Sequence, residues 1–124
     1  MISTLLQVAL GGALGASARF LAGLALAREV SGVPVAILAV NVLGSLLMGL
    51  AVVWTARSGQ TALSPFLMTG LLGGFTTFSA FSLEAYTLFE RGQSGAAAAY
   101  VGLSVGLSIA GLAAGVILAR GIWA

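Results

Sequence analysis

The sequence predicts an all-α membrane protein with one domain, residues 1–124, and four transmembrane helices, the third broken near the bilayer midplane. Of its residues, 60% are hydrophobic and 6% are charged, a composition that soluble domains do not have. Short polar stretches divide the chain into four apolar segments, each long enough to cross a ~30 Å hydrocarbon core. The third segment contains adjacent glycines and adjacent threonines, where an unbroken helix would be the default.

The first two spans are expected at about residues 4–27 and 33–55. The first contains no acidic residue and a single arginine, Arg19. The second follows a polar loop and opens at Pro34, because proline is favoured in the first turn of a helix.

The last two spans are expected at about residues 65–90, with a break at 73–77, and at 95–119. Ser64 before Pro65 is typical of a helix start. From Pro65 to the break is about 15 Å of helix at 1.5 Å per residue. That is half of the hydrocarbon core, so we expect the break near the midplane.

Two glycines and two threonines predict the break. Gly73 and Gly74 each weaken a helix by about 1 kcal/mol, and Thr76 and Thr77 carry hydroxyls that can cap a new helix start. We therefore expect the helix to stop near Gly74 and to restart near Thr77. In lipid, a broken backbone survives only inside protein or beside a wet cavity, as at ion and substrate sites.

Glycines four residues apart predict closely packed helices, since they let two backbones approach. Some of these pairs are expected by chance in a chain with 18 glycines. The pairs are Gly11 and Gly15, Gly70 and Gly74, Gly102 and Gly106, and Gly111 and Gly115.

The charged residues exclude several function classes. The chain has no Cys, His, Lys or Asp, which leaves almost nothing for hydrolytic or redox chemistry. Its net charge of +2 comes from scattered arginines, so nucleic-acid binding is not expected.

Arginines at the span ends leave the orientation weakly specified. Arg57 and Arg120 fall on the side of the termini, and Arg28 and Arg91 fall on the other. A chain that inserts both ways can form an antiparallel homodimer, equivalent to the inverted repeat of larger transporters. The alternative is that the balance is an accident of few charges.

Asn41, Phe78 and Phe81 are the first candidates for an ion path. The Asn41 amide offers two donors inside an apolar segment; it serves either an anion or helix packing. Phe78 and Phe81 share a helix face, and their ring edges are positive. Packing is the ordinary role of two such phenylalanines.

Tyr100, Ser104 and Ser108 lie four residues apart and form a polar stripe on the fourth span. Their hydroxyls could donate to a dehydrating anion, although membrane serines usually bond to their own helix. Glu84 and Arg19 are ionisable groups within spans, which are functional candidates by default. Glu84 could serve a vestibule or pair with an arginine, whereas Arg19 could pair with a carbonyl or a carboxylate or attract anions into a vestibule.

Three motifs together resemble the Fluc (CrcB) family of fluoride channels. They are GGFTTFSAFS at 73–82, NVLGS at 41–45, and GGALGA at 11–16 followed by Arg19. The likeness covers essentially the whole chain. Ala80 departs from the family, which commonly has a hydroxyl residue there, so a side-chain contact from this position is not expected.

The resemblance implies an antiparallel homodimer with two pores in the cell (inner) membrane, which exports fluoride passively and selectively from the cytoplasm. It implies a structural Na⁺ at the dimer axis, bound by the carbonyls of Gly73 and Thr76. It also implies that the anion contacts the ring edges of two phenylalanines, an amide donor and a polar track: Phe78, Phe81, Asn41, Tyr100, Ser104 and Ser108.

Two other classes are weighed against a channel. Small multidrug transporters are also short, four-spanning and of dual topology, but they resemble a pattern with a glutamate in the first span, which this chain lacks. A structural subunit of a larger complex would need neither a break nor a polar track. Proton-coupled fluoride antiport is disfavoured, since no titratable group is expected at the midplane.

Overall fold

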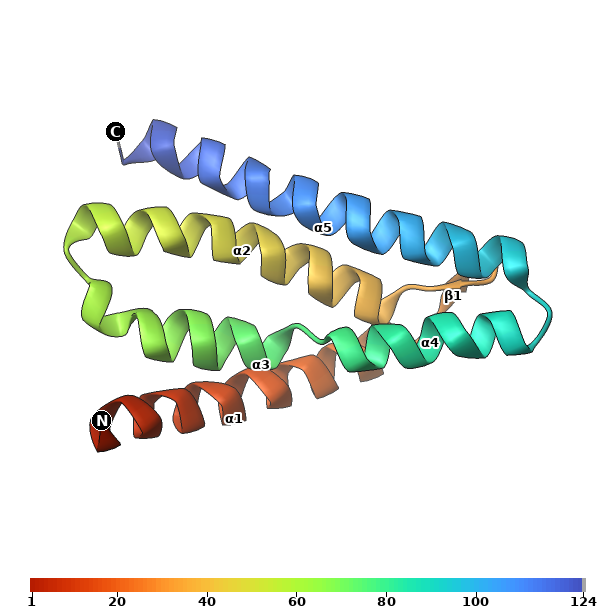
Figure 1. The fold of residues 1–124 in the computed structure, drawn as a ribbon, viewed down its shortest axis with the longest axis horizontal. Coiled ribbons are helices and arrows are strands. Elements are labelled where there is room, and N and C mark those ends of the chain that lie inside the picture. Colours follow the sequence, from red (N-terminus) through yellow and green to blue (C-terminus); the bar gives the residue numbers. More distant parts are fainter. Residues whose placement is uncertain (124) are drawn as a thin grey trace.

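The chain forms four long helical rods in a computed structural model that describes residues 1–123. The rods are α1 (Ile2–Ala25), α2 (Ala36–Ser58), a composite third rod (Thr61–Glu90) and α5 (Ser94–Ile122). All four are long and apolar enough to cross a membrane. Both termini lie at one end, together with the turn that leaves α2 (Figure 1). The predicted helical class, with four helices long and apolar enough to span a membrane, is therefore confirmed.

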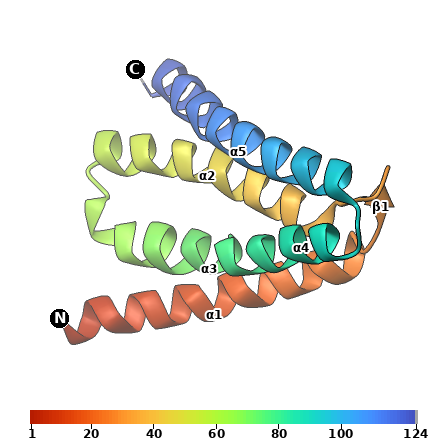
Figure 2. The ribbon, with the colours of Figure 1, turned by 45° about the vertical axis from the view of Figure 1, so that its right-hand side comes forward.

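The rods pack in pairs, α1 beside the third rod and α2 beside α5, as both views show (Figures 1 and 2). Glycines make these contacts close. A Cβ added at Gly15 would overlap the carbonyl oxygen of Leu71, and one added at Gly115 would overlap that of Leu46. Three of the four predicted glycine pairs lie at such contacts. A Cβ added at Gly102 or Gly106 would meet no atom within 4 Å among residues 1–123, so this pair makes no close helix contact there.

The third rod changes its helical form along its length. It runs through η1 (Thr61–Leu63), the π-helix η2 (Pro65–Leu72), the short α3 (Gly73–Phe75) and, after a break, α4 (Phe78–Glu90). The predicted break in the third span is thus confirmed. The π-helical turns were not predicted.

The break lies at Thr76 and Thr77, within the predicted range 73–77 and directly after the helical segment that contains the two glycines. Gly73 keeps a helical backbone, with φ −64° and ψ −36°. Thr76 and Thr77 are extended, with ψ of 155° and 125°. The helix ends at Phe75, next to Gly74 as expected, but the β-branched threonines, which favour extended backbone, and not the glycines leave the helical conformation. The expected restart beside Thr77 is confirmed.

A small hairpin replaces the expected start of the second span. β1 (Glu29–Val30) pairs antiparallel with β2 (Val33–Pro34), so the role predicted for Pro34 in the first helical turn is wrong. Ser31 and Gly32, both with positive φ, form the turn, as two-residue hairpin loops require. Val33 is buried among residues of α4 and α5, and this burial holds the strand against the bundle.

Candidate functional site: a cavity at the helix break

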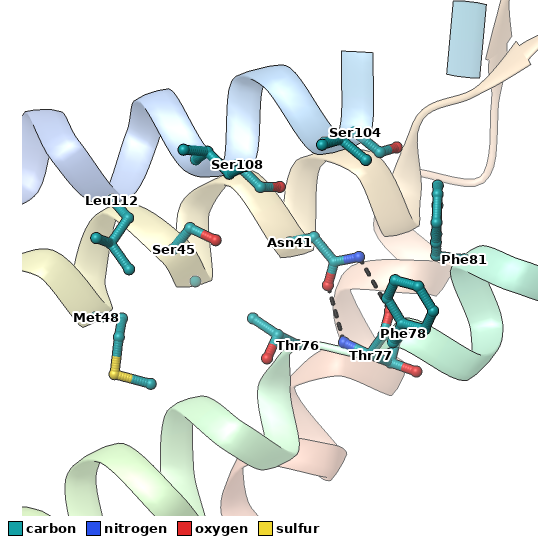
Figure 3. Close-up of a pocket in the computed structure, with 13 residues that line it drawn as sticks. Asn41, Ser45, Met48, Thr76, Thr77, Phe78, Phe81, Ser104, Ser108 and Leu112 are labelled. Atoms are coloured by element: carbon teal, nitrogen blue, oxygen red, sulfur yellow. Dashed lines mark hydrogen bonds between the residues drawn. The ribbon is translucent and has the colours of Figure 1, made fainter. Parts of the chain in front are cut away.

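Asn41 on α2 holds the break through two hydrogen bonds to a single residue. Its Oδ1 accepts the backbone N–H of Thr77 at 2.8 Å, and its Nδ2 donates to the carbonyl of Thr77 at 3.0 Å (Figure 3). The amide therefore satisfies backbone groups that the interrupted helix leaves unpaired. One of the two Nδ2 protons is used, and the other remains to donate elsewhere.

The two threonine hydroxyls finish the ends of the broken helix. Thr77 Oγ1 accepts the N–H of Ala80 at 3.2 Å and so caps α4, as predicted. Thr76 Oγ1 donates to the carbonyl of Leu72 at 3.0 Å, one turn back in the rod. Ala80 takes part through its backbone, which agrees with the absence of a hydroxyl at this position.

These bonds release the two carbonyls that the resemblance assigns to Na⁺. In an unbroken helix Gly73 would accept from the N–H of Thr77, and Thr76 from that of Ala80. Those N–H groups bond instead to Asn41 and to the Thr77 hydroxyl. Within residues 1–123 no group of three His, Cys, Asp or Glu side chains could hold a metal.

Arg19 on α1 lies beside the same break. Its Nε donates to the carbonyl of Gly74 at 3.4 Å, which is one of the pairings expected for a charged group inside a span. The contact brings a positive charge to the carbonyl end of α3, where it is electrostatically favourable.

A cavity of about 370 Å³ opens beside the break, between α2, α4 and α5 (Figure 3). It brings together five of the six predicted pore residues: Asn41, Phe78, Phe81, Ser104 and Ser108. Ser45, Thr76 and Thr77 add further polar groups that were not predicted as lining residues. Ser45 lies one turn after Asn41 in the same motif, and this spacing could have found it.

Ser104 is the least satisfied polar group in the cavity wall. Its side chain is 5% exposed, and its Oγ is buried with no hydrogen-bond partner among residues 1–123. A buried hydroxyl without a partner is unfavourable by about 1–3 kcal/mol. A bound anion or water in the cavity would supply the missing partner.

The two phenylalanines form one aromatic wall, as their spacing predicted. Their ring centroids are 5.3 Å apart, with planes tilted by 55°. Phe81 is 8% exposed, whereas Phe78 is 76% exposed. So much uncovered aromatic surface, in the middle of a span, leaves this side of the cavity open in a single chain.

Tyr100 lies behind the cavity wall rather than in it. It is fully buried, stacks obliquely on Phe81 with centroids 5.4 Å apart, and donates its hydroxyl to Glu84 Oε2 at 2.5 Å. Tyr100 and Glu84 do not line the cavity, whereas Phe81 does. The Tyr100 ring supports Phe81, and its hydroxyl is the partner of Glu84, which the sequence left open.

The break also sets the electrostatic field of the cavity. α4 begins at Phe78, so its N-terminal N–H groups and the positive end of its dipole lie at the cavity. The lining contains amide, hydroxyl and aromatic groups and no charged side chain. The arrangement can therefore stabilise a small anion without neutralising it by an ion pair.

Comparison with known proteins agrees with this geometry. The family described as "CrcB-like protein, Camphor Resistance (CrcB)" matches residues 6–116. A protein of Ruegeria sp. (strain TM1040) is 63% identical over 124 residues, 98% of each chain, and one of Cereibacter sphaeroides is 65% identical over 122 residues, 98% of each. One of Paracoccus denitrificans is 50% identical over 124 residues, all of both chains. All three are named "Fluoride-specific ion channel FluC". The chain belongs to the CrcB family.

Proposed function

We propose that this chain forms a fluoride-selective passive channel, which lets fluoride leave the cytoplasm through the cell (inner) membrane. The names of its relatives support this function. The observation that carries it is the uncharged cavity at the helix break, with its unpaired Ser104 hydroxyl, the Asn41 amide and two phenylalanines. The chain acts as a conduit rather than an enzyme.

The cavity chemistry suits an ion that must lose and regain its water. Hydroxyl and amide donors replace water around the anion, and positive ring edges surround it. Because no fixed positive charge lines the cavity, the anion is not held too tightly to leave, as conduction requires. The absence of a titratable side chain from the lining favours passive flow over proton coupling.

The alternative of a small multidrug transporter has less support. α1 contains no acidic residue that could couple substrate to protons, and the relatives are named for fluoride rather than for drugs. The two alternatives also predict different transport, since a channel moves fluoride without a proton gradient.

We propose that the working unit is an antiparallel homodimer. The exposed Phe78 and the open side of the cavity support this, because a second copy would cover both. The equal arginine counts at the two ends support insertion in both orientations. Each dimer would then contain two related pores.

We also propose a structural Na⁺ where the two breaks meet at the dimer axis. The carbonyls of Gly73 and Thr76 lack their helical donors, and Gly73 is exposed. A two-fold axis would double these oxygens, and oxygen ligands suit a hard cation. The site would be built of backbone, so its role would be to hold the two breaks together.

Fluoride efflux from liposomes tests the function. Vesicles that contain the purified protein are loaded with potassium fluoride, and valinomycin compensates the charge that leaves. Fluoride should leave within seconds, while chloride in matched vesicles should stay inside. Equal release of both ions, or fluoride release that requires a pH gradient, would contradict a selective passive channel.

Charge bias tests the dimer separately. Two lysines inserted beside Ser58 should force one orientation and abolish flux. An oppositely biased variant with two lysines beside Gly92 should restore flux on co-expression and be inactive alone. Full flux from either variant alone would overturn the antiparallel arrangement.

A further inference from the structure

A second cavity, of about 280 Å³, lies between α2 and the third rod toward the end that holds the termini. Six aliphatic side chains of α2 and η2 line it, together with Trp54 and Trp123. The two indole rings carry the only polar side-chain groups among these lining residues. Such a space cannot hold a polar ligand, and in a membrane it would be filled by hydrocarbon rather than stay empty.

This cavity opens on a different side of α2 from the cavity at the break. The two cavities share no lining residue of α2. The cavity at the break is lined by Asn41, Gly44, Ser45 and Met48, and the apolar cavity by Leu47, Leu50, Ala51 and Trp54. At about 100° per residue their centres lie roughly 120° apart around the helix. A second copy that covers Phe78 would therefore leave the apolar cavity to the lipid.

The end of the bundle next to this cavity is positively charged. Arg57 and Arg120 end α2 and α5 there. Within residues 1–123, all three glutamates lie in β1 or α4, and the side chains at the terminal end include no carboxylate to balance the arginines. This asymmetry would attract an anionic headgroup to that end.

Arg57 links this charge to the cavity wall. Its Nη1 donates to the carbonyls of Trp123 at 2.7 Å and Arg120 at 3.2 Å, so it holds one of the residues that line the cavity. The other guanidinium nitrogens have no partner in residues 1–123 and can bind a phosphate. Two tryptophans beside an arginine are typical of the membrane–water interface.

We propose that the apolar cavity binds an acyl chain of an anionic phospholipid, whose phosphate contacts Arg57. The proposal rests on the membrane location of the chain and not on which ion it conducts. In either orientation of the chain, the site would take its lipid from the leaflet at the terminal end.

Native mass spectrometry tests the site on the purified full-length protein. It is titrated with phosphatidylglycerol and, separately, with phosphatidylcholine of the same acyl chains. Phosphatidylglycerol should bind about tenfold more tightly, as expected for one or two interfacial arginines. Ala51→Phe fills the cavity and should abolish binding of both lipids. Ala98→Phe, on an exposed part of α5 outside the cavity, is the matched control and should bind as the wild type does.

The headgroup has its own pair of variants. Arg57→Gln should remove the preference for phosphatidylglycerol, while Arg91→Gln at the opposite end should keep it. If Ala51→Phe does not elute as a folded protein, Leu47→Phe at the cavity rim replaces it.

Wild-type binding by the cavity-filling variants would overturn the site, and equal affinity for the two lipids would overturn the anionic ligand. Disulfide-linked dimers through Leu67→Cys, in a chain without other cysteines, would show that a second copy covers the cavity. That result would also overturn the proposal.

Discussion

Asn41→Asp separates the two roles of the amide at the break. Aspartate keeps an oxygen that accepts the N–H of Thr77. It puts a second oxygen in place of Nδ2, which in the native protein donates to the carbonyl of Thr77 at 3.0 Å. That carbonyl would lose its donor and face a negative oxygen instead. An unsatisfied buried acceptor is unfavourable by about 1–3 kcal/mol, so the variant should be less stable by an amount of that order.

The effect on fluoride should be larger than the effect on stability. Repulsion by the new carboxylate raises the free energy of an anion within about 4 Å by about 4 kcal/mol at an effective dielectric constant near 20. Since each 1.36 kcal/mol changes a rate about tenfold, flux should fall about 1,000-fold. The measurement is fluoride efflux from liposomes, on protein that still elutes as a dimer.

Asn41→Ala is the matched control, because it removes both hydrogen bonds to Thr77 without adding charge. It should conduct more than Asn41→Asp. Equal losses in the two variants would assign the effect to the lost bonds rather than to repulsion. Wild-type flux in Asn41→Asp, with the carboxyl shown to be ionised by infrared spectroscopy, would refute the placement of Asn41 on the ion path.

Three further predictions follow from the contacts. Gly15→Ala should destabilise the protein by about 1–3 kcal/mol in thermal unfolding, because the new methyl overlaps the Leu71 carbonyl. Gly102→Ala, in open space, should leave the stability unchanged. Equal effects of the two variants would contradict the close packing of α1 against the third rod. Thr77→Val removes the cap of α4 and should lower stability by about 1 kcal/mol, an effect that Thr77→Ser should avoid. Phe78→Ile and Phe81→Ile keep apolar bulk, so if the rings line the path fluoride efflux should collapse at a stability loss below about 1.5 kcal/mol; intact efflux would make them packing residues.

Local signals predicted much of the fold. Hydropathy located the four spans, and Thr77 was recognised as a residue that can restart a helix. Which residues of 73–77 leave the helical conformation needed the structure, because Gly73 tolerates helical backbone as well as other conformations. The strand at Pro34 was missed for a different reason: its stability comes from burial of the neighbouring Val33 against α4 and α5, a tertiary contact with no local pattern.

The candidate site divides in the same way. Spacing along one helix placed Phe78 beside Phe81 and Ser104 near Ser108, and the cavity contains all four. The bonds from Asn41 to Thr77 join residues 36 positions apart, and composition gives no hint of that pairing. Tyr100 shows the limit of a stripe argument, since its hydroxyl follows the helical spacing but bonds to Glu84 instead of facing the cavity.

Blocking the cavity with a single cysteine tests most directly that fluoride passes beside the break. The chain has no cysteine, so Ser108→Cys provides one reactive thiol in the cavity wall, and Ile117→Cys, 68% exposed and outside the cavity, provides the control. Both proteins are reconstituted in liposomes and treated with a small methanethiosulfonate reagent, and labelling is verified by mass. The account predicts that the reagent stops fluoride efflux through Ser108→Cys and leaves Ile117→Cys unchanged. Undiminished efflux through fully labelled Ser108→Cys would contradict it.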